Sequence, residues 1–381
     1  NEIGEKKYKQ IENLSKPIAA ASIAQVHFAT IEGKQYAIKV LRPGIEKKFN
    51  EELEALMLFA SIVETILPKT KRLKLIEIVH LLKEITAIEM DLRFEGSAGS
   101  ELKNNTKSDP KFKVPNINWD FTSKRVLTSE KVEGISIKEL DKINELKINK
   151  KELAKNIIQN FLRQAVGDGF FHGDMHQGNL FVDSDGNIIP VDFGIMGRLD
   201  KDNRKYLAEI LYGFIQRDYE KVADVHFIAG LVPLDQSKDA FSQALRSIGE
   251  PIFGQSIKNI SAGKLLAQLF EITEQFNMAT QPQLLLLQKT MVVVEGVART
   301  LDEDANIWEI SKPVLEGWLK KEVGPEAKIN QAIKTTSQVM DRLPELPGMM
   351  DKASKALELL AAGTVASNND MAKKFEFEKL K

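Results

Sequence analysis

The sequence predicts an α+β protein with two lobes, a β-rich N-terminal lobe that carries inserted helices and a mainly helical C-terminal lobe. Three observations support this prediction. Residues 17–42 read as two strands joined at a glycine turn, the chain after Gly134 follows a helical pattern, and a short strand–turn–strand unit interrupts that pattern at 180–191. We divide the chain into an N-terminal lobe, a C-terminal lobe and a helical extension, with bounds 1–133, 134–312 and 313–381.

The N-terminal lobe is expected to begin with a hairpin that turns at Glu32-Gly33-Lys34. In its second strand, "EGKQYAIKV", Ala37, Lys39 and Leu41 share one face, and the residues between them share the other. Pro43-Gly44 ends the hairpin. Two helices are predicted next, at about 45–67 and 73–102, followed by two extended runs, "KVPNINWDF" and "RVLTSEKV".

The C-terminal lobe is predicted to contain an amphipathic helix around 156–166, two short strands at 180–182 and 188–191, and a helix that begins near Arg204. The strands flank a turn at Asp185-Gly186. The apolar stretch 284–298 is interrupted by Lys289 and Glu295, so we expect a buried helix there and no membrane span.

The composition narrows the function classes. The sequence has 53 Lys and Arg against 54 Asp and Glu, a net charge of −1, which gives no support for a nucleic-acid partner. It has no cysteine, which excludes disulfides and thiolate chemistry and fits a reducing compartment. A hydrophobic content of 43% over 381 residues is ample for a large core.

The segment "HGDMHQGN", followed by "VDFG", carries the chemistry. Asp174 and Asn179 are five residues apart, and Asp192 lies thirteen residues beyond Asn179. Phosphoryl transfer from ATP needs Mg²⁺, which prefers carboxylate and amide oxygens. We expect Asp174 to orient or deprotonate an acceptor hydroxyl or water, and Asn179 and Asp192 to hold Mg²⁺. His172 is expected to orient this loop by hydrogen bonding.

The strand "AIKV" supplies the complementary charge. Lys39 would place its ammonium group on the α/β-phosphates of ATP, and the small side chain of Ala37 would leave room for the adenine. Such a lysine needs a carboxylate partner, for which the helical stretch "AIEMDLRFEGSAGSEL" offers Glu89, Asp91 and Glu95. We expect Glu95 to pair with Lys39 and take part in catalysis, with Glu89 as the second choice.

The stretch "PIAAASIAQV" stands where a glycine-rich phosphate loop is expected. Alanine reaches the left-handed conformation only at a cost of roughly 1 kcal/mol or more, so we expect a stiff loop that changes how ATP and ADP are held. The small side chains still allow close approach to phosphate, and Ser22 adds a hydroxyl group. The predicted nucleotide-binding residues are Ala19, Ala20, Ala21, Ser22, Ile23, Ala24, Val26, Ala37 and Lys39.

The ordered set of AIK, an acidic helix, HxDxxxxN and DFG predicts a protein-kinase-like fold. Two differences set the chain apart from protein kinases: Gly173 replaces the arginine beside the catalytic Asp, and no APE-like segment follows DFG.

Together with "PIAAASIAQVHFA", "FFHGDMHQGNLFV" and "QPQLLLLQKTMVVVEGVARTLD", these motifs resemble the UbiB family of atypical kinases linked to ubiquinone biosynthesis, most closely its bacterial members. The resemblance covers about residues 14–350.

The resemblance implies binding of ATP and Mg²⁺, and ATPase activity more than protein phosphorylation. It also implies a place on the cytoplasmic face of the bacterial inner membrane. The implied partners are ATP and ADP, membrane lipids, quinone precursors and other ubiquinone-biosynthesis proteins. The family's N-terminal Lys-x-Gly-Gln segment and its C-terminal membrane segments have no counterpart in the sequence, and we interpret both differences as truncation.

Three alternatives stay open at this point. A small-molecule phosphotransferase of the aminoglycoside or choline kinase type shares the HGDxxxxN loop. A pseudokinase scaffold would bind nucleotide without turnover, although Asp174, Asn179 and Asp192 are all present. A metallohydrolase built on His172, Asp174 and His176 would leave Lys39 without a role.

Overall fold

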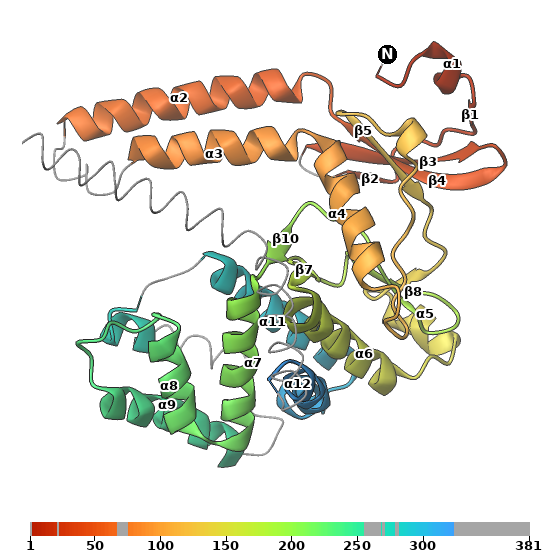
Figure 1. Cartoon of the computed structure of the whole chain (residues 1–381). Coiled ribbons are helices and arrows are strands. Elements are labelled where there is room, and N and C mark those ends of the chain that lie inside the picture. Colours follow the sequence, from red (N-terminus) through yellow and green to blue (C-terminus); the bar gives the residue numbers. More distant parts are fainter. Residues whose placement is uncertain are drawn as a thin grey trace, which may run out of the picture. The chain divides into compact units, whose positions relative to one another are not determined.

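The computed structural model describes residues 2–20, 23–66, 75–254, 268, 271–278 and 282–323 (Figure 1). The chain divides into two compact units, Asn1–Trp318 and Leu319–Lys381, and the elements that carry the site belong to the first. Ala21 and Ser22 of the predicted nucleotide loop, and 324–381 of the predicted helical extension, lie outside the described residues. The lobe bounds at 133 and 312 stay predictions.

A sheet of five strands forms the N-terminal lobe, after the short helix α1 (Glu5–Tyr8). Strands β3 (Ala24–Ile31) and β4 (Lys34–Leu41) pair antiparallel, as the alternating sequence predicts. Glu32 and Gly33 between them have φ of 51° and 76°, the left-handed pair that a tight hairpin turn requires. The other strands are β1 (Ile11–Glu12) and β2 (Ala19–Ala20), which pair with β3, and β5 (Val126–Glu130), which pairs with β4.

The two extended runs predicted after residue 112 have different outcomes. The second contains β5, but the first contains no strand and ends in a single 3₁₀ turn, Trp119–Phe121. Pro115 has no backbone N–H to give to a ladder, and the chain instead makes separate bonds, such as the one from the Asn118 N–H to the Thr128 carbonyl at 2.8 Å.

The two faces of the sheet bury different clusters. On one face Ile38 packs with Ala29, Ile31 and Phe121. On the other, Leu41 and Ala24 pack with Leu127 and Leu92. Lys39 lies on this second face, because it alternates with Ile38 and shares its side of the sheet with Leu41.

Three helices separate β4 from β5: α2 (Ile45–Ile66), α3 (Leu75–Glu89) and α4 (Leu92–Asn105). The prediction of one helix over 73–102 is wrong, because the helix breaks at Met90-Asp91. Asp91 is the N-cap of α4, and its carboxylate accepts the backbone N–H of Arg93 at 3.1 Å. Glu89 and Asp91 therefore do not share a helix face with Glu95.

The C-terminal lobe is helical, as predicted. Helix α6 begins at Lys150, six residues before the predicted stretch 156–166, and continues into a π-helical turn, Arg163–Asp168. Figure 1 shows α11 beside α6, and Leu287, Thr290 and Val294 of α11 are buried. No helix in the described part of the chain is long and apolar enough to cross a membrane. The helices whose bounds lie in the described residues are α5 (Leu140–Glu145), α6 (Lys150–Leu162), α7 (Lys201–Gln216), α8 (Tyr219–Ile228), α9 (Lys238–Gly254), α11 (Pro282–Leu301) and α12 (Ile307–Val323).

Five short strands hold the two motif loops. β7 (Phe170–His172) pairs with β10 (Met196–Arg198), and β8 (Leu180–Val182) lies between β6 (Ile135–Ser136) and β9 (Ile188–Pro190). The strand predicted at 188–191 thus ends one residue early, at Pro190. This arrangement places the loop 173–179 between β7 and β8 and the DFG residues 192–194 between β9 and β10. The α+β prediction with a β-rich first lobe and a helical second lobe is confirmed.

Candidate functional site

Lys39 and Glu95 form a nearly buried ion pair. The ammonium Nζ of Lys39 lies 2.8 Å from Oε1 and 2.9 Å from Oε2 of Glu95, and the two side chains are 16% and 9% exposed. Helix α4 can cover this face of the sheet because Gly96 has no side chain, since a Cβ there would lie 3.0 Å from Leu127 Cδ1. The pairing of Lys39 with Glu95, predicted from sequence, is confirmed.

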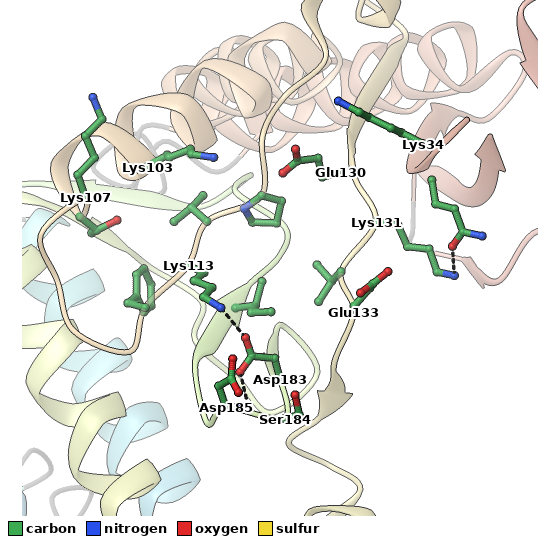
Figure 2. A pocket seen from close by; sticks show the side chains of 17 residues that line it. Lys34, Lys103, Lys107, Lys113, Glu130, Lys131, Glu133, Asp183, Ser184 and Asp185 are labelled. Carbon is green, nitrogen blue, oxygen red and sulfur yellow. Dashed lines mark hydrogen bonds and ion pairs between the residues drawn. The ribbon is translucent and has the colours of Figure 1, made fainter. Parts of the chain in front are cut away.

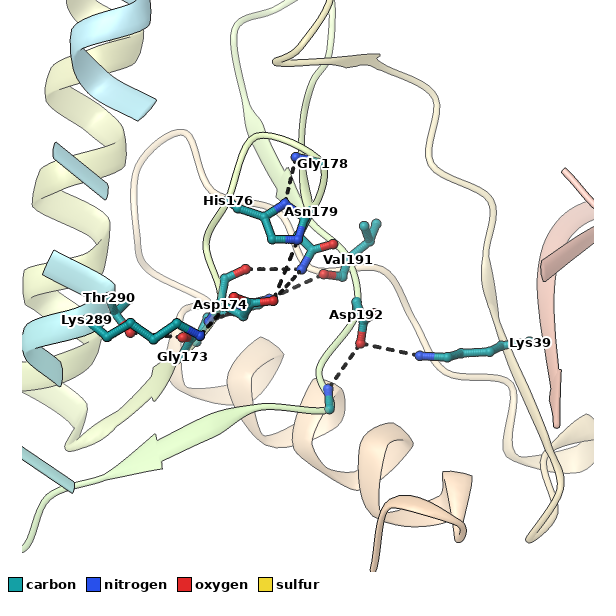
Figure 3. A network of polar contacts seen from close by, with 12 residues as sticks. Lys39, Gly173, Asp174, His176, Gly178, Asn179, Val191, Asp192, Lys289 and Thr290 are labelled. Carbon is teal, nitrogen blue, oxygen red and sulfur yellow. Dashed lines mark hydrogen bonds and ion pairs between the residues drawn. The ribbon is translucent and has the colours of Figure 1, made fainter. Parts of the chain in front are cut away.

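Asp192 joins this pair from the other side (Figure 3). Its Oδ1 lies 3.3 Å from the Lys39 ammonium, and its side chain stays 44% exposed. Burial lowers the pKa of Lys39, but the charges of Glu95 and Asp192 outweigh that effect and hold the pKa above its usual value. Burial by itself raises the pKa of Asp192. The charge of Lys39 and the hydrogen bond from the Gly194 N–H lower it by more, so this pKa lies below its usual value. Both groups are charged at neutral pH.

The DFG segment is held in a strained and closely packed conformation. Asp192 has φ of 63°, a left-handed value that costs a non-glycine residue of order 1 kcal/mol and tends to occur at functional positions. Phe193 is buried, with its ring 5.9 Å from that of His172. A Cβ at Gly99 of α4 would lie 2.8 Å from Phe193 Cδ2, so only glycine permits this approach.

His172 fixes the start of the catalytic loop. It is fully buried, and its Nδ1 accepts the backbone N–H of Asp174 at 3.1 Å. Its Nε2 therefore carries the proton and donates to the Val191 carbonyl, 3.3 Å away. One imidazole thus ties the loop that carries Asp174 to the residue before Asp192, which confirms the predicted orienting role of His172.

Burial holds the pKa of His172 below its usual value. A folded-state pKa below that of the unfolded chain means that the unfolded chain takes up a proton first, so His172 lowers stability as pH falls below about 6.5. We expect the free energy of unfolding to fall between pH 7 and 5, and to fall less steeply in His172→Asn. Denaturant melts over this range measure both slopes; equal slopes in the two proteins would contradict the assignment. His226, buried in α8 with a lowered pKa, keeps its own contribution in both proteins.

Asp174 and Asn179 meet across the catalytic loop. The Asn179 amide Nδ2 donates to the Asp174 carbonyl at 3.1 Å and lies 3.5 Å from its carboxylate Oδ2. The Asp174 side chain is 27% exposed, so the carboxylate is reachable. His176 approaches the same carboxylate, with Nε2 3.6 Å from Oδ2, while its Nδ1 accepts the Gly178 N–H. Figure 3 shows these contacts converging on Asp174.

Asn179 and Asp192 suit a magnesium ion by their chemistry. The Val191 N–H donates to the Asn179 carbonyl at 2.8 Å, which brings the two predicted ligands onto neighbouring segments. Because Nδ2 of Asn179 points to Asp174, its amide oxygen is directed elsewhere and can bind a cation. A carboxylate and an amide oxygen are the donors that Mg²⁺ prefers.

The alternative metal site on His172, Asp174 and His176 does not fit the geometry. Both ring nitrogens of His172 are engaged in hydrogen bonds inside the core. In the described part of the chain, no group of three His, Asp or Glu side chains is arranged to hold a metal ion. The arrangement therefore gives no support to a metallohydrolase.

The alanine-rich segment adopts a different structure from the predicted loop. Ala19 and Ala20 form β2, opposite Val26 and Gln25 of β3, so they are extended and not left-handed. These two alanines therefore avoid the left-handed conformation that would be costly for them, because an extended strand suits any L-residue. A hydrogen-bonded strand still makes this segment stiffer than a free glycine flap.

Some of the remaining predicted nucleotide-binding residues lie on the face of the sheet that carries Lys39, and others pack into the core. Val26 pairs with Lys39 in the β3–β4 register, so both lie on one side of the sheet with Ala37. The side chain of Ala24 is fully buried in the core beside Leu41, and only its backbone can reach a ligand. Ile23 packs against the same core cluster, and its carbonyl accepts the Arg42 N–H at 2.9 Å.

Two residues of α11 at the catalytic loop were missed by sequence reasoning. The Lys289 ammonium lies 3.5 Å from Asp174 Oδ1, and the buried hydroxyl of Thr290 donates to the Gly173 carbonyl at 2.9 Å. In the sequence, Lys289 is visible only as a charge that interrupts an apolar helix. Nothing local connects it to a motif that lies 115 residues away.

A separate cavity of about 820 Å³ is lined in part by the residues that follow β5, among them Lys131 and Glu133 (Figure 2). Part of its charged lining is paired: Lys113 contacts Asp183 at 2.9 Å, and Lys131 donates to Gln35 at 2.7 Å. It contains none of the predicted site residues. We therefore identify the candidate site by the side chains that meet around Lys39, Asp174 and Asp192, and not by the size of a cavity. The lysines and acids that line it are Lys34, Lys103, Lys107, Lys113, Lys131, Glu130, Glu133, Asp183 and Asp185.

Comparison with known families and proteins agrees with this arrangement. The ABC1 atypical kinase-like domain matches residues 2–226, and the UbiB helical domain matches residues 245–306. The chain is 38% identical over 358 residues to "Probable protein kinase UbiB" of Marinobacter nauticus, which covers 93% of this chain and 65% of that protein. It is 37% identical over 349 residues to the protein of the same name from Azotobacter vinelandii, with 90% and 64% covered. The chain thus spans just under two thirds of the length of these relatives.

A solved structure shares the fold. Rv3197 from Mycobacterium tuberculosis, determined in complex with erythromycin, matches with a TM-score of 0.63 and 21% sequence identity, covering 82% of this chain and 80% of that one. At this identity the likeness supports the fold alone. The family match, which covers more than half of the chain and includes both motif loops, shows that this chain belongs to the UbiB family of ABC1 atypical kinase-like proteins.

Proposed function

We propose that this protein binds ATP with Mg²⁺ and transfers the γ-phosphoryl group to water or to a hydroxyl acceptor. The observation that carries the proposal is the cluster in which Lys39 lies within 3.3 Å of both Glu95 and Asp192. In this reading Lys39 contacts the α/β-phosphates, and Asn179 and Asp192 hold Mg²⁺, which would neutralise the developing phosphate charge. Ala19, Ala20, Val26 and Ala37 would surround the nucleotide.

The reaction would proceed by displacement at phosphorus. The oxygen of water or of an acceptor hydroxyl forms a bond to the γ-phosphorus, and the bond from that phosphorus to the β–γ bridging oxygen breaks. The electron pair of the broken bond stays on ADP. The proton of the nucleophile passes to the carboxylate of Asp174 and then to solvent. Asp174 suits this role because its side chain is accessible and its backbone is fixed by His172.

A thermal-shift measurement tests the nucleotide site directly. We expect ATP or ADP with Mg²⁺ to raise the melting temperature, and EDTA to remove most of the rise. Asp192→Asn should abolish the Mg²⁺-dependent part, because the amide loses the full charge that binds the metal. Phosphate release, measured in parallel, separates turnover from a pseudokinase that binds without reacting. A wild-type protein with no Mg²⁺-dependent response to either nucleotide would contradict the proposal.

We further propose that the activity supports ubiquinone biosynthesis at the cytoplasmic face of the bacterial inner membrane. The support comes from relatives that carry the UbiB name and align over most of this chain. The acceptor would then be a quinone precursor or water, with membrane lipids and other ubiquinone-biosynthesis proteins as partners. Phosphate release stimulated by anionic lipid vesicles or by a quinone head group would favour this setting over a soluble small-molecule acceptor such as an aminoglycoside or choline.

A further inference from the structure

We infer that Lys289, which comes from the helical domain and not from the kinase-like domain, is a phosphate-binding residue of this site. The inference rests on the proposed function and extends it. It assigns to α11 a direct contact with the γ-phosphoryl group of ATP, at the end of the site where Asp174 acts. The kinase-like match ends at residue 226, so that domain by itself would lack this cation.

Helix α11 is fastened to the catalytic loop beside Lys289. The fully buried Thr290 hydroxyl lies within hydrogen-bonding distance of two carbonyls, that of Gly173, the residue next to Asp174, at 2.9 Å and that of Leu286 in its own helix at 2.8 Å. A Cβ on Gly173 would lie 3.1 Å from Leu286 Cδ2, so this helix packs closely against the loop backbone. About three turns further along the helix, the Gln177 amide donates to the Thr300 hydroxyl at 3.3 Å. The Lys289 backbone is therefore placed by a rigid element and not by a surface loop.

The Lys289 ammonium has the position and freedom that a ligand contact needs. It lies 3.5 Å from Asp174 Oδ1, and its side chain remains 56% exposed. An exposed pair at this distance contributes little to stability, so stability alone does not explain the placement of the lysine. Figure 3 shows Lys289 reaching Asp174 from the side opposite to Lys39, so that the two lysines bracket the catalytic carboxylates.

The other basic groups of the site leave the negative charge of the transferred phosphoryl group without a nearby side-chain cation. Lys39 is shared between the carboxylates of Glu95 and Asp192, which already offset its charge. His172 is neutral because burial lowers its pKa. The transferred phosphoryl group spreads negative charge over its three outer oxygens in the transition state. Lys289 would donate hydrogen bonds to those oxygens while Asp174 takes the proton of the nucleophile.

Lys289→Met tests this contact through a difference between two ligands. A non-hydrolysable ATP analogue carries the γ-phosphoryl group and ADP does not. With Mg²⁺ present, we expect the variant to bind the analogue about tenfold more weakly and to bind ADP within twofold of wild type. Phosphate release should fall about 100-fold, the size typical for loss of one transition-state electrostatic contact. Lys289→Arg, which keeps the charge, should recover most of both losses.

Lys205→Met is the matched control, since Lys205 is an exposed lysine of α7. It should leave both affinities and the rate unchanged. The melting temperature of Lys289→Met without ligand should match wild type, which separates a ligand contact from a structural role.

Two results would overturn the inference and leave the proposed function standing. One is that Lys289→Met binds ADP and the analogue with equally weakened affinity. The other is that Lys289→Met releases phosphate at the wild-type rate when the wild type turns ATP over. A wild type that binds both ligands without turnover would contradict the proposed transfer, while the two-ligand comparison would still decide the role of Lys289. A wild type that binds neither ligand would overturn both.

Discussion

Lys39→Met should lower the free energy of unfolding by about 3 kcal/mol even without nucleotide, because it leaves the Glu95 carboxylate uncompensated. Glu95 is 9% exposed, and both of its carboxylate oxygens contact the Lys39 ammonium, at 2.8 and 2.9 Å. The same change removes the cation proposed to bind the α/β-phosphates. We therefore also expect loss of stabilisation by Mg²⁺-nucleotide. Urea unfolding measures the first effect, and thermal shifts with ATP measure the second.

The two effects can be separated with a double variant. In Lys39→Met with Glu95→Gln, the buried charge is gone, so part of the lost stability should return while nucleotide binding stays lost. Burial raises the pKa of Glu95, so the penalty in Lys39→Met should also shrink as pH falls and the carboxylate is protonated. Lys47→Met, in the exposed pair with Glu51, serves as the control and should change stability by no more than about 0.5 kcal/mol. A loss in Lys39→Met no larger than this control would contradict the buried-pair argument.

Asp174→Asn should slow phosphate release by about 100- to 10,000-fold, the range expected when a positioned base is lost. The reason is chemical, because an amide cannot accept the proton of the attacking hydroxyl. The fold should tolerate the change, since His172 bonds the Asp174 backbone N–H and Asn179 bonds its carbonyl. Steady-state turnover, together with the affinity for ADP, checks the expectation.

Affinity for ADP should stay within a few-fold of wild type in Asp174→Asn, because this side chain lies away from the Lys39, Glu95 and Asp192 cluster that we assign to the nucleotide. Asp185→Asn, an exposed carboxylate in the turn between β8 and β9, provides the matched control and should leave the rate unchanged. If Asp174→Asn released phosphate within about threefold of wild type, Asp174 would not be the base. A parallel loss of ADP binding would instead indicate a structural defect.

Local patterns predicted the hairpin of the N-terminal lobe well. Alternation around Lys39 fixed which residues share its face, and Glu32-Gly33 marked the turn that β3 and β4 use. Sequence reasoning failed where a local hydrogen bond competed with a continuous helical pattern. The Asp91 carboxylate caps α4 and divides the predicted helix in two, because a cap satisfies backbone donors that a continuous helix would have used.

The alanine-rich segment shows a second limit of sequence reasoning. The composition of 19–22 indicated small side chains and a stiff backbone, but it did not indicate that Ala19 and Ala20 pair with β3. Strand pairing depends on a partner and a register, which belong to the sheet and not to the segment.

The sequence by itself determined the chemical inventory of this protein. Two local properties of the chain were enough for this. The number of residues between them sets the spacing of Asp174, Asn179 and Asp192, and the two-residue alternation of a strand identifies the segment that carries Lys39. Only the tertiary structure decided which of Glu89, Asp91 and Glu95 meets Lys39, because that choice depends on where α4 begins and how closely Gly96 lets it approach the sheet. It also placed Lys289 of α11 beside Asp174, a contact made by helix packing across 115 residues of chain that no local pattern encodes.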